Sequence, residues 1–303
     1  MMVTLQEAFY KEKFNNLFYR TKGTAFQEFF EELMGLAYKS DFMACRPWGN
    51  RGDRKNDGYQ TSSRTLFQVY APYDMSEAKC IKKINEDFEG AREYWGTYLD
   101  VWCFVHNAYS GLPPHVIETL LELSSKNPGI KVERWGLDKL LEVFRLLSPE
   151  DKESWFGPAP SEETQATLTF KDIQVVLDNI KRQSIKPNQV VRDVPRGKIE
   201  ANALSKDVAV MLKAGMARTP LVSQFYEQWH DPTFGESIAA SFRAKYETLR
   251  DDLTPNQVFE ELQTWVGGDT RGTPQHEVAI ITVLAYYFER CDIFEEPRSE
   301  VSS

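Results

Sequence analysis

Residues 41–72 restrict the fold more than any other stretch, because apolar runs flank a polar loop rich in turn residues here. The loop, residues 48–56, combines glycines and asparagines with several charges. Apolar runs on both sides of such a loop are typical of a β-hairpin. Ala71 and Pro72 end the last run, since proline cannot donate to a sheet ladder. The stretch predicts short strands at residues 41–46, 58–61 and 65–70.

The last of these strands has two chemically distinct faces. Successive side chains of a strand point to opposite sides of the sheet. Leu66, Gln68 and Tyr70 are therefore expected on one face, and Phe67 and Val69 are expected to pack on the other.

Helices and further strands surround the hairpin. A helix is expected at residues 24–38, where Thr24 can cap it after Gly23 and phenylalanines recur at helical spacing. The elements expected beyond the hairpin are helix 75–95, strand 98–106, helix 112–123, strand 130–135 and helix 137–147. This order predicts an α/β domain whose mixed sheet has helices on both faces.

From residue 198 onward every apolar pattern is helical. The candidate helices are residues 199–215, 220–229, 234–253, 254–265 and 275–291. Thr254 and Pro255 suit the cap and the first position of their helix. The last helix is apolar nearly all round, which predicts a central, fully buried helix.

The predicted organisation is therefore an α/β domain followed by an all-α domain. Its parts are the α/β domain at residues 1–155, a linker with one helix at 156–197, the all-α domain at 198–296 and a tail at 297–303. The proline and glycine content near residue 157 and the proline-rich, charged stretch 184–197 mark the exposed connections.

The net charge of −9 is concentrated at one end of the chain. Residues 251–303 hold 3 Lys or Arg against 11 Asp or Glu, whereas residues 1–250 hold 33 against 34. The acidic end suits either solubility or a basic partner surface, and the global charge does not exclude a polyanionic partner for the rest.

The cysteine pattern favours a reducing compartment. Cys45, Cys80, Cys103 and Cys291 lie far apart without a C-x-x-C pair, and the histidines form no metal-binding cluster, so a zinc site is not expected. The N-terminus has no apolar core of signal-peptide length, and the longest apolar run, residues 278–288, is about half a bilayer span. We expect a cytoplasmic protein that does not insert into a membrane.

Three residues of the hairpin offer hard oxygen ligands. Asp57 has a carboxylate, Gln68 an amide oxygen and Val69 a main-chain carbonyl. Mg²⁺ and Mn²⁺ prefer oxygen ligands, and a metal-polarised water can attack a phosphodiester. The stretch predicts a site for Mg²⁺ or Mn²⁺, although Asp57-Gly58 would also suit a simple turn, and Gln68 and Tyr70 taken singly are ordinary strand residues.

Positive charge gathers around the same loop. The cluster consists of Arg46, Arg51, Arg54, Lys55 and Arg64. Such an excess suits the phosphates of DNA, and it equally suits a solvated loop.

At these positions the sequence resembles the PD-(D/E)XK, or restriction-endonuclease-like, superfamily, in particular its Mrr-related branches in bacterial antiphage defence. Gly23 and Gln27 match a glycine followed four positions later by Glu or Gln, Asp57 matches the metal aspartate, and Gln68-Val69-Tyr70 matches the Q-x-K element. The resemblance covers about residues 20–107.

The resemblance implies a metal-dependent DNA endonuclease. Asp57 and Gln68 would bind the metal ion, with Gln27 and Glu28 behind them. The family lysine is Tyr70 here, and a phenol with an ordinary pKa near 10 is a poor substitute. Lys55 or Lys79 is the expected source of a migrated lysine, and Tyr70 would otherwise orient a ligand or stack on substrate.

The helical region carries a second resemblance. Its motifs are FYEQWHD at residues 225–231, TPNQVF at 254–259 and AYYFERCDIF at 285–294. They resemble the C-terminal domains of ABC three-component, or Lamassu-type, defence systems. In those systems a nuclease or other effector is fused to such a domain and works with an SMC-like ATPase and a small middle component.

Together the two resemblances imply a DNA endonuclease effector regulated by partner subunits, with a homo-oligomer on activation as a further expectation. The alternative is a catalytically degenerate nuclease fold that senses nucleic acid or bridges partners. A third interpretation is a structural subunit of an unrelated system.

Overall fold

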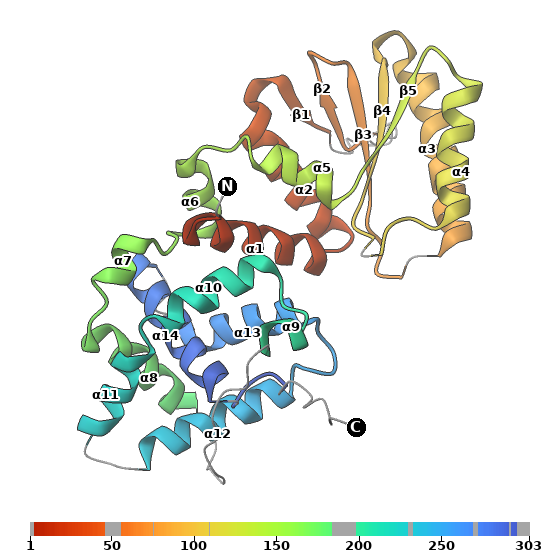
Figure 1. Cartoon of the computed structure of the whole chain (residues 1–303). Helices are drawn as coiled ribbons and strands as arrows, with labels where there is room; N and C mark the ends of the chain where they lie inside the picture. The colour runs from red at the N-terminus through yellow and green to blue at the C-terminus, as the bar shows by residue number, and fades with distance from the viewer. Residues whose placement is uncertain are drawn as a thin grey trace. The chain divides into compact units, whose positions relative to one another are not determined.

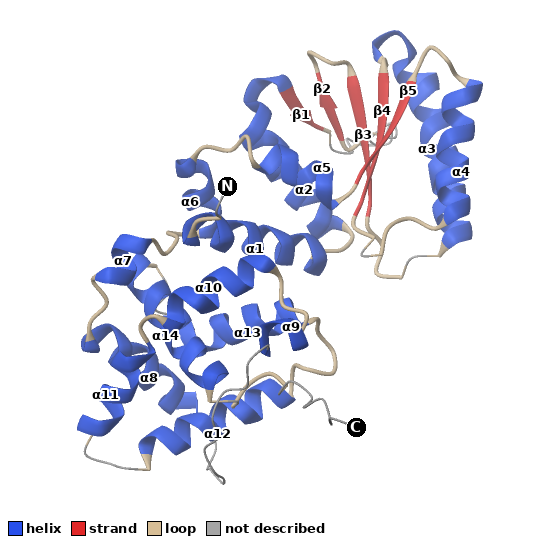
Figure 2. Cartoon of the chain, viewed as in Figure 1, coloured by secondary structure: helices blue, strands red, loops and turns tan. Residues whose placement is uncertain are grey.

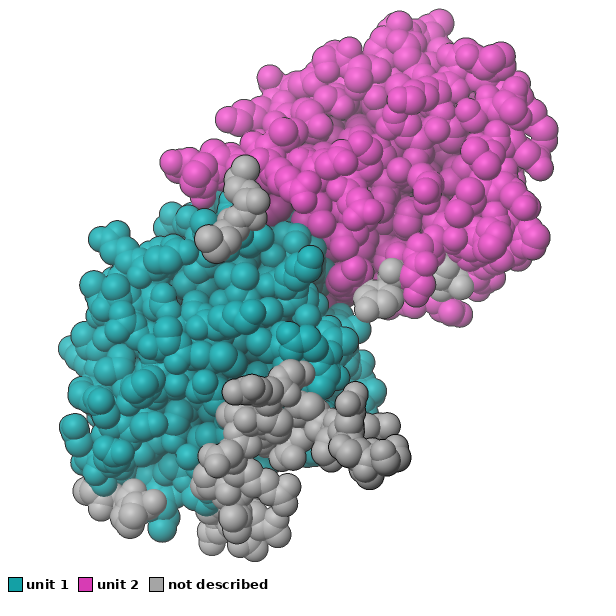
Figure 3. Space-filling view, viewed as in Figure 1, with its two compact units in different colours: residues 1–16, 152–303 teal, residues 17–151 magenta. Residues whose placement is uncertain are grey.

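The computed structural model describes residues 3–45, 56–74, 76–108, 110–183, 198–229, 233–268, 272–290 and 292–295. The chain divides into two compact units, residues 17–151 and residues 1–16 with 152–303 (Figure 3). We refer to them as the sheet unit and the helical unit.

The sheet unit is built on one five-stranded sheet (Figure 2). The strands are β1 (Phe42–Ala44), β2 (Gly58–Gln60), β3 (Thr65–Tyr70), β4 (Val101–His106) and β5 (Lys131–Trp135), in spatial order β1-β2-β3-β4-β5. The first three strands are antiparallel, and β3, β4 and β5 are parallel. The prediction of a mixed sheet is confirmed.

Helices cover both faces of this sheet (Figure 1). They are α2 (Thr24–Tyr38), α3 (Glu77–Trp95), α4 (Pro114–Lys126) and α5 (Leu137–Phe144), with short 3₁₀ turns at η1 (Lys39–Asp41) and η3 (Gly96–Tyr98). Leu66 joins the core beneath α3 and α4. Phe67 lies on the other face, with its ring 5.3 Å from that of Phe30 on α2. The predicted alternation along β3 is therefore confirmed for this pair.

One local prediction at the start of the chain needs correction, and one helix is not predicted. The N-cap of α2 is Gly23, with φ of 53°, and Thr24 is the first helical residue, without a side-chain cap bond. A positive φ is a conformation that glycine adopts at little cost, so Gly23 rather than Thr24 sets the turn. The sequence analysis also lacks α1 (Leu5–Arg20), which begins in the helical unit and ends in the sheet unit.

The remaining helices form the helical unit, apart from α6, which begins at the end of the sheet unit. They are α6 (Pro149–Phe156), α7 (Glu162–Ala166), α8 (Phe170–Gln183), α9 (Lys198–Ala201), α10 (Lys206–Met216), α11 (Thr219–Gln228), α12 (Phe234–Glu247), α13 (Pro255–Gly267) and α14 (Pro274–Glu289). Every residue of α14 from His276 to Phe288 is buried, so the predicted central helix is confirmed. Thr254 caps α13 in a reciprocal pair with Gln257, as predicted.

Other features of the helical unit differ from the sequence analysis. The helix expected at 199–215 is interrupted at Ala203, whose φ is 49°, and α10 starts afresh with Ser205 as its cap. Within the stretch predicted as a linker, α8 packs against α11, α12, α13 and α14. Its residues Ile173, Val176, Leu177 and Ile180 are fully buried, so α8 is a core helix of the helical unit.

Candidate acid–amide site on the sheet

Asp57 lies just before β2 and faces the carboxyl-terminal half of β3. Its main-chain N–H donates to Phe67 O at 3.0 Å, which continues the β2–β3 pairing by one residue. Its Oδ2 atom accepts from Gln68 Nε2 and from Val69 N, each at 2.7 Å. The residue is only 6% exposed. The structure thus brings Asp57, Gln68 and Val69 together.

The Gln68 side chain is held by this carboxylate but is only half satisfied. An ionised carboxylate only accepts, so the amide nitrogen must face Asp57. The buried Oε1 atom of Gln68 then has no hydrogen-bond partner in the described part of the chain. A buried acceptor without a donor is costly, and it suits a ligand that approaches as a cation or a donor.

Asn56 shapes the turn that delivers Asp57. Its Oδ1 accepts from Gly58 N at 2.8 Å, which is an Asx-type turn. Asn56 is fully buried, and its Nδ2 lacks a partner among the described residues. The close approach of Gly58 to Phe42 keeps this turn tight, because a Cβ there would lie 2.6 Å from the Phe42 ring.

Tyr70 occupies the position of the family lysine but points into the core of the α3 face. Its ring lies 5.9 Å from that of Phe104, and it packs against the buried cluster beneath α3 and α4. Burial, with smaller contributions from Cys80 and Asp87, raises the pKa of the Tyr70 phenol above 10. Tyr70 is therefore a neutral hydroxyl at physiological pH.

The remaining predicted residues are distributed more widely. Gln27 Nε2 donates to Glu31 Oε1 on the same helix at 3.0 Å, and Glu28 is exposed. Lys79 is exposed on α3. Arg64 lies at the amino end of β3, where it pairs with Asp100 at 3.5 Å. Arg46, Arg51, Arg54 and Lys55 lie outside the described residues.

Two backbone contacts bring a segment missed by sequence reasoning to the same end of the sheet. Gly23 N donates to Ala71 O at 2.6 Å, directly after β3. Asn107 Nδ2 donates to Thr21 O at 2.6 Å, directly after β4. Residues 21–23 are therefore fixed across the carboxyl ends of two parallel strands, where α/β sheets commonly bind ligands.

Lys22 and Tyr73 are the notable side chains of this segment. Lys22 is half-buried, forms no ion pair in the part of the chain that is described, and burial lowers the pKa of its amine. Tyr73 is 88% exposed, and its Cε2 atom lies 3.6 Å from the position that a Cβ on Gly23 would occupy. The sequence signal for both was only their proximity to Gly23 and to the end of β3.

His106, at the end of β4, serves the structure of the sheet. It is buried, and its Nδ1 lies 3.2 Å from the donating Ala108 N–H. Burial, together with the nearby Arg134 charge, lowers the pKa of His106 to about 4. The imidazole is therefore neutral at physiological pH.

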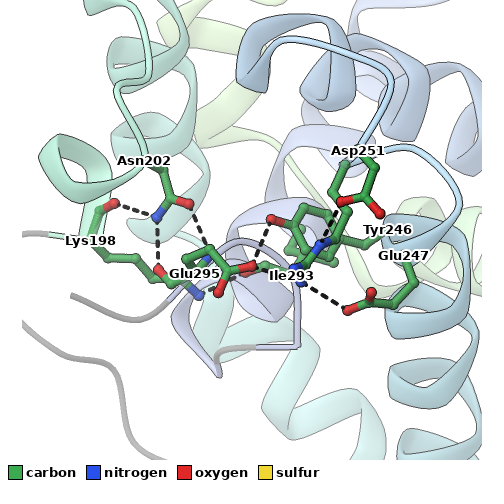
Figure 4. A network of polar contacts seen from close by, with 8 residues as sticks. Lys198, Asn202, Tyr246, Glu247, Asp251, Ile293 and Glu295 are labelled. Atoms are coloured by element: carbon green, nitrogen blue, oxygen red, sulfur yellow. Dashed lines mark hydrogen bonds and ion pairs between the residues drawn. The ribbon is translucent and has the colours of Figure 1, made fainter. Parts of the chain in front are cut away.

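A second polar cluster, in the helical unit, holds the segment that follows α14 (Figure 4). Lys198 Nζ donates to Phe288 O at 2.9 Å and to Ile293 O at 2.7 Å. Asn202 Nδ2 donates to Glu295 O at 2.7 Å, and Glu295 N donates to Asn202 Oδ1 at 2.8 Å. Arg250 pairs with the Glu295 carboxylate at 2.8 Å. These bonds satisfy main-chain groups beyond a helix end, which is a structural role.

Fold and site define a two-unit protein: an α/β unit with a buried acid–amide pair on its sheet, and an all-helical unit. Residues 171–295 match the model of C-terminal domain 10 of the ABC-three component (ABC-3C) systems. The match runs from α8 to the segment after α14, and it supports a place for the helical unit in such a system. No curated protein and no solved structure matches the chain. Among the described helices, none has both the length and the apolarity needed to cross a bilayer.

Proposed function

We propose that the chain is the effector subunit of an ABC-3C defence complex and that its sheet unit is a restriction-endonuclease-like, metal-dependent DNA endonuclease. The helical unit would dock on an SMC-like ATPase and a small middle subunit, which hold the nuclease in check until it is activated. The family match supports the system, and the resemblance of residues 20–107 supports the chemistry.

One observation carries the nuclease proposal. The Asp57 carboxylate and the Gln68 amide are hydrogen-bonded in a buried position on the central sheet, and the Gln68 Oε1 atom has no hydrogen-bond partner among the described residues. A buried carboxylate beside an unsatisfied amide oxygen is a donor set suited to a hard divalent cation.

The residues present fit Mg²⁺ or Mn²⁺ only with help from other oxygens. Among the described residues, no group of three or more His, Cys, Asp and Glu side chains could hold a metal ion. Asp57 and Gln68, with the Val69 carbonyl as a third donor, would hold the cation, and water or DNA phosphate would complete its shell, as is usual for Mg²⁺. The bound ion would polarise a water molecule for attack on phosphorus.

The test compares wild type with Asp57→Asn in the reconstituted complex supplied with Mg²⁺ or Mn²⁺ and plasmid DNA. We expect Asp57→Asn to reduce cleavage by roughly a hundredfold or more, because the charge that binds the metal is lost. Asp100→Asn, at an exposed aspartate directly before β4, serves as the control. Equal cleavage by wild type and Asp57→Asn would refute the nuclease proposal.

Tyr70 supports a second candidate, a degenerate nuclease fold that binds nucleic acid or bridges partners without cutting. A neutral, core-packed phenol cannot supply the positive charge of the family lysine. This candidate predicts that Asp57→Asn retains full phage protection and normal complex assembly. Loss of protection with assembly intact would exclude it.

A further inference from the structure

The carboxyl ends of β3 and β4 carry a cation and an aromatic ring that the metal chemistry does not use. Gly23 is bonded to Ala71, and Ala71 follows Val69 by two residues, or about 7 Å of extended strand. Val69 N is itself bonded to the Asp57 carboxylate. Gly23 is thus anchored two residues beyond Val69, just after β3, and Lys22 is its neighbour in the chain.

Lys22 has the features of a phosphate contact. The residue is half-buried, and no carboxylate pairs with its amine in the described chain. Burial lowers the pKa of the Lys22 amine because it disfavours the charged form. A bound anion such as a phosphate would stabilise that charged form. By contrast, five other lysines of the sheet unit pair with an acid in the described chain: Lys82, Lys83, Lys126, Lys131 and Lys139.

Tyr73 has the features of a stacking platform. It is the most exposed large apolar side chain among those of the described chain, at 88%. Its ring lies beside Gly23, and therefore one residue from Lys22. Proteins bind single-stranded nucleic acid with aromatic rings, on which the bases stack, and with nearby cations, which contact the phosphates.

We propose that Lys22 and Tyr73 form a binding site for an unpaired DNA strand beside the Asp57–Gln68 pair, with Lys22 on a phosphate and Tyr73 stacked on a base. The proposal rests on the proposed DNA-directed function, and it names DNA with single-stranded character as the substrate class. Duplex DNA keeps its bases stacked inside, so Tyr73 would contribute little to duplex binding.

The experiment measures binding of the full chain, alone and with its partner subunits, to a fluorescein-labelled single strand and to the matching duplex. EDTA is present throughout, and anisotropy is read from about 50 to 200 mM salt. On the single strand, Lys22→Gln should reduce the slope of log K against log salt by about 0.7, since one phosphate contact is lost. Tyr73→Ala should raise the single-strand Kd about fivefold or more and leave the slope unchanged.

Matched controls lie at the amino end of the same sheet. Lys131→Gln removes the same charge at the start of β5, and Tyr98→Ala removes a ring that is 63% exposed. Both should bind as wild type does. Lys22→Arg should retain the wild-type salt slope, and thermal melting curves should match for all variants, because the altered side chains are not core residues.

The inference is overturned if Lys22→Gln and Tyr73→Ala bind like their controls, if the Tyr73 effect is equal on duplex and single strand, or if the intact protein binds neither DNA. None of these binding measurements depends on DNA cleavage. If Asp57→Asn does not reduce cleavage but the Lys22 and Tyr73 effects persist, the nuclease proposal fails and the strand-binding site stands.

Discussion

Asp57 is the residue that organises the candidate site, and its contacts make it a structural residue as well. Its carboxylate accepts from Gln68 Nε2 and Val69 N at 2.7 Å in a buried environment. Removal of the acceptor would leave the buried Gln68 Nε2 and the part-buried Val69 N without this partner, and an unsatisfied buried donor costs about 1–3 kcal/mol.

We therefore expect Asp57→Ala to lower the free energy of unfolding of the sheet unit by about 1–3 kcal/mol or more. Asp57→Asn keeps one acceptor and should cost less. Urea denaturation of the metal-free protein measures both, with the exposed Asp100→Ala as the comparison. An Asp57→Ala variant as stable as Asp100→Ala would show that the two hydrogen bonds contribute no net stability.

At the residue scale, the sequence predicts the acid–amide pair better than its surroundings. Asp57, Gln68 and the Val69 carbonyl are expected as neighbours from the sequence, and the structure brings the three residues together through Gln68 Nε2 and the Val69 N–H. Lys22 and Tyr73 are not predicted. Their placement depends on two long-range main-chain bonds, from Gly23 to Ala71 and from Asn107 to Thr21, which leave no periodic trace in the sequence.

At the scale of elements, the β1–β2 hairpin depends on a single close approach. A Cβ on Gly58 would lie 2.6 Å from two atoms of the buried Phe42 ring and 3.7 Å from Phe30. The ring cannot move freely, because it also packs against Phe30 and Phe67 at centroid distances of 5.9 and 6.2 Å.

Gly58→Ala should consequently destabilise the sheet unit by about 1–3 kcal/mol, which is the usual cost of overpacking a core. Gly129→Ala is the matched control, since nothing lies within 4 Å of its Cβ position. Urea unfolding measures the difference. Equal stability of the two variants would mean that Phe42 can shift at no cost.

Helix α1 contains a buried acid that makes stability depend on pH. Glu12 is 2% exposed, and its oxygens accept from Ser205 Oγ at 3.0 Å and Asn16 Nδ2 at 3.4 Å. Burial, with smaller contributions from the Asp207 and Glu260 charges, raises the pKa of Glu12 to about 7, although the Ser205 hydroxyl and the Lys11 charge oppose the shift.

The folded pKa of Glu12 exceeds its unfolded value, so the folded state binds the proton more tightly. Its contribution to stability is complete below the unfolded pKa of 4.5 and is lost as the pH rises through about 7. Glu12→Gln mimics the protonated acid. We expect Glu12→Gln and wild type to be similarly stable at about pH 5, and Glu12→Gln to be more stable by about 3 kcal/mol at about pH 8.

Urea titrations at both pH values test this, with Glu163→Gln, an exposed glutamate of α7, as the control. A constant difference between Glu12→Gln and wild type at both pH values would contradict the assignment.

The distribution of buried residues around α1 explains why this helix is not predicted from the sequence. Buried residues of α1 include Leu5, Phe9, Glu12, Phe14 and Asn16, which lie on several sides of the helix and include polar groups. No single apolar stripe results, so the helical period is weak. By contrast, α2 carries its buried phenylalanines on one face and is correctly predicted.

At the scale of the whole molecule, the sequence predicts an α/β part and an all-α part, but it assigns helix α8 to a linker instead of to the all-α part. Helix α8 is flanked by stretches rich in proline, glycine and charge, which are typical of linkers. It is nevertheless a core helix, because it packs against α14 through four fully buried residues: Ile173, Val176, Leu177 and Ile180. Such long-range packing cannot be predicted from the local sequence pattern.

The helical unit has its own point of close approach, at which α10 meets α14. A Cβ on Gly215 would lie 2.6 Å from Ile281 O and 2.8 Å from Ala285 Cβ. A main-chain carbonyl within a buried helix cannot move aside as a flexible side chain can. We therefore expect Gly215→Ala to force the two helices apart.

Gly58→Ala and Gly215→Ala thus place one comparable perturbation in each compact unit. Since units with separate cores open as separate cooperative units, we expect Gly58→Ala to speed amide hydrogen exchange mainly within residues 17–151, and Gly215→Ala mainly within residues 152–303. Peptide-resolved exchange by mass spectrometry measures this on the intact chain. If each substitution instead accelerated exchange equally in both ranges, the chain would unfold as one cooperative body, and a signal received by the helical unit would change the stability of the Asp57 site directly.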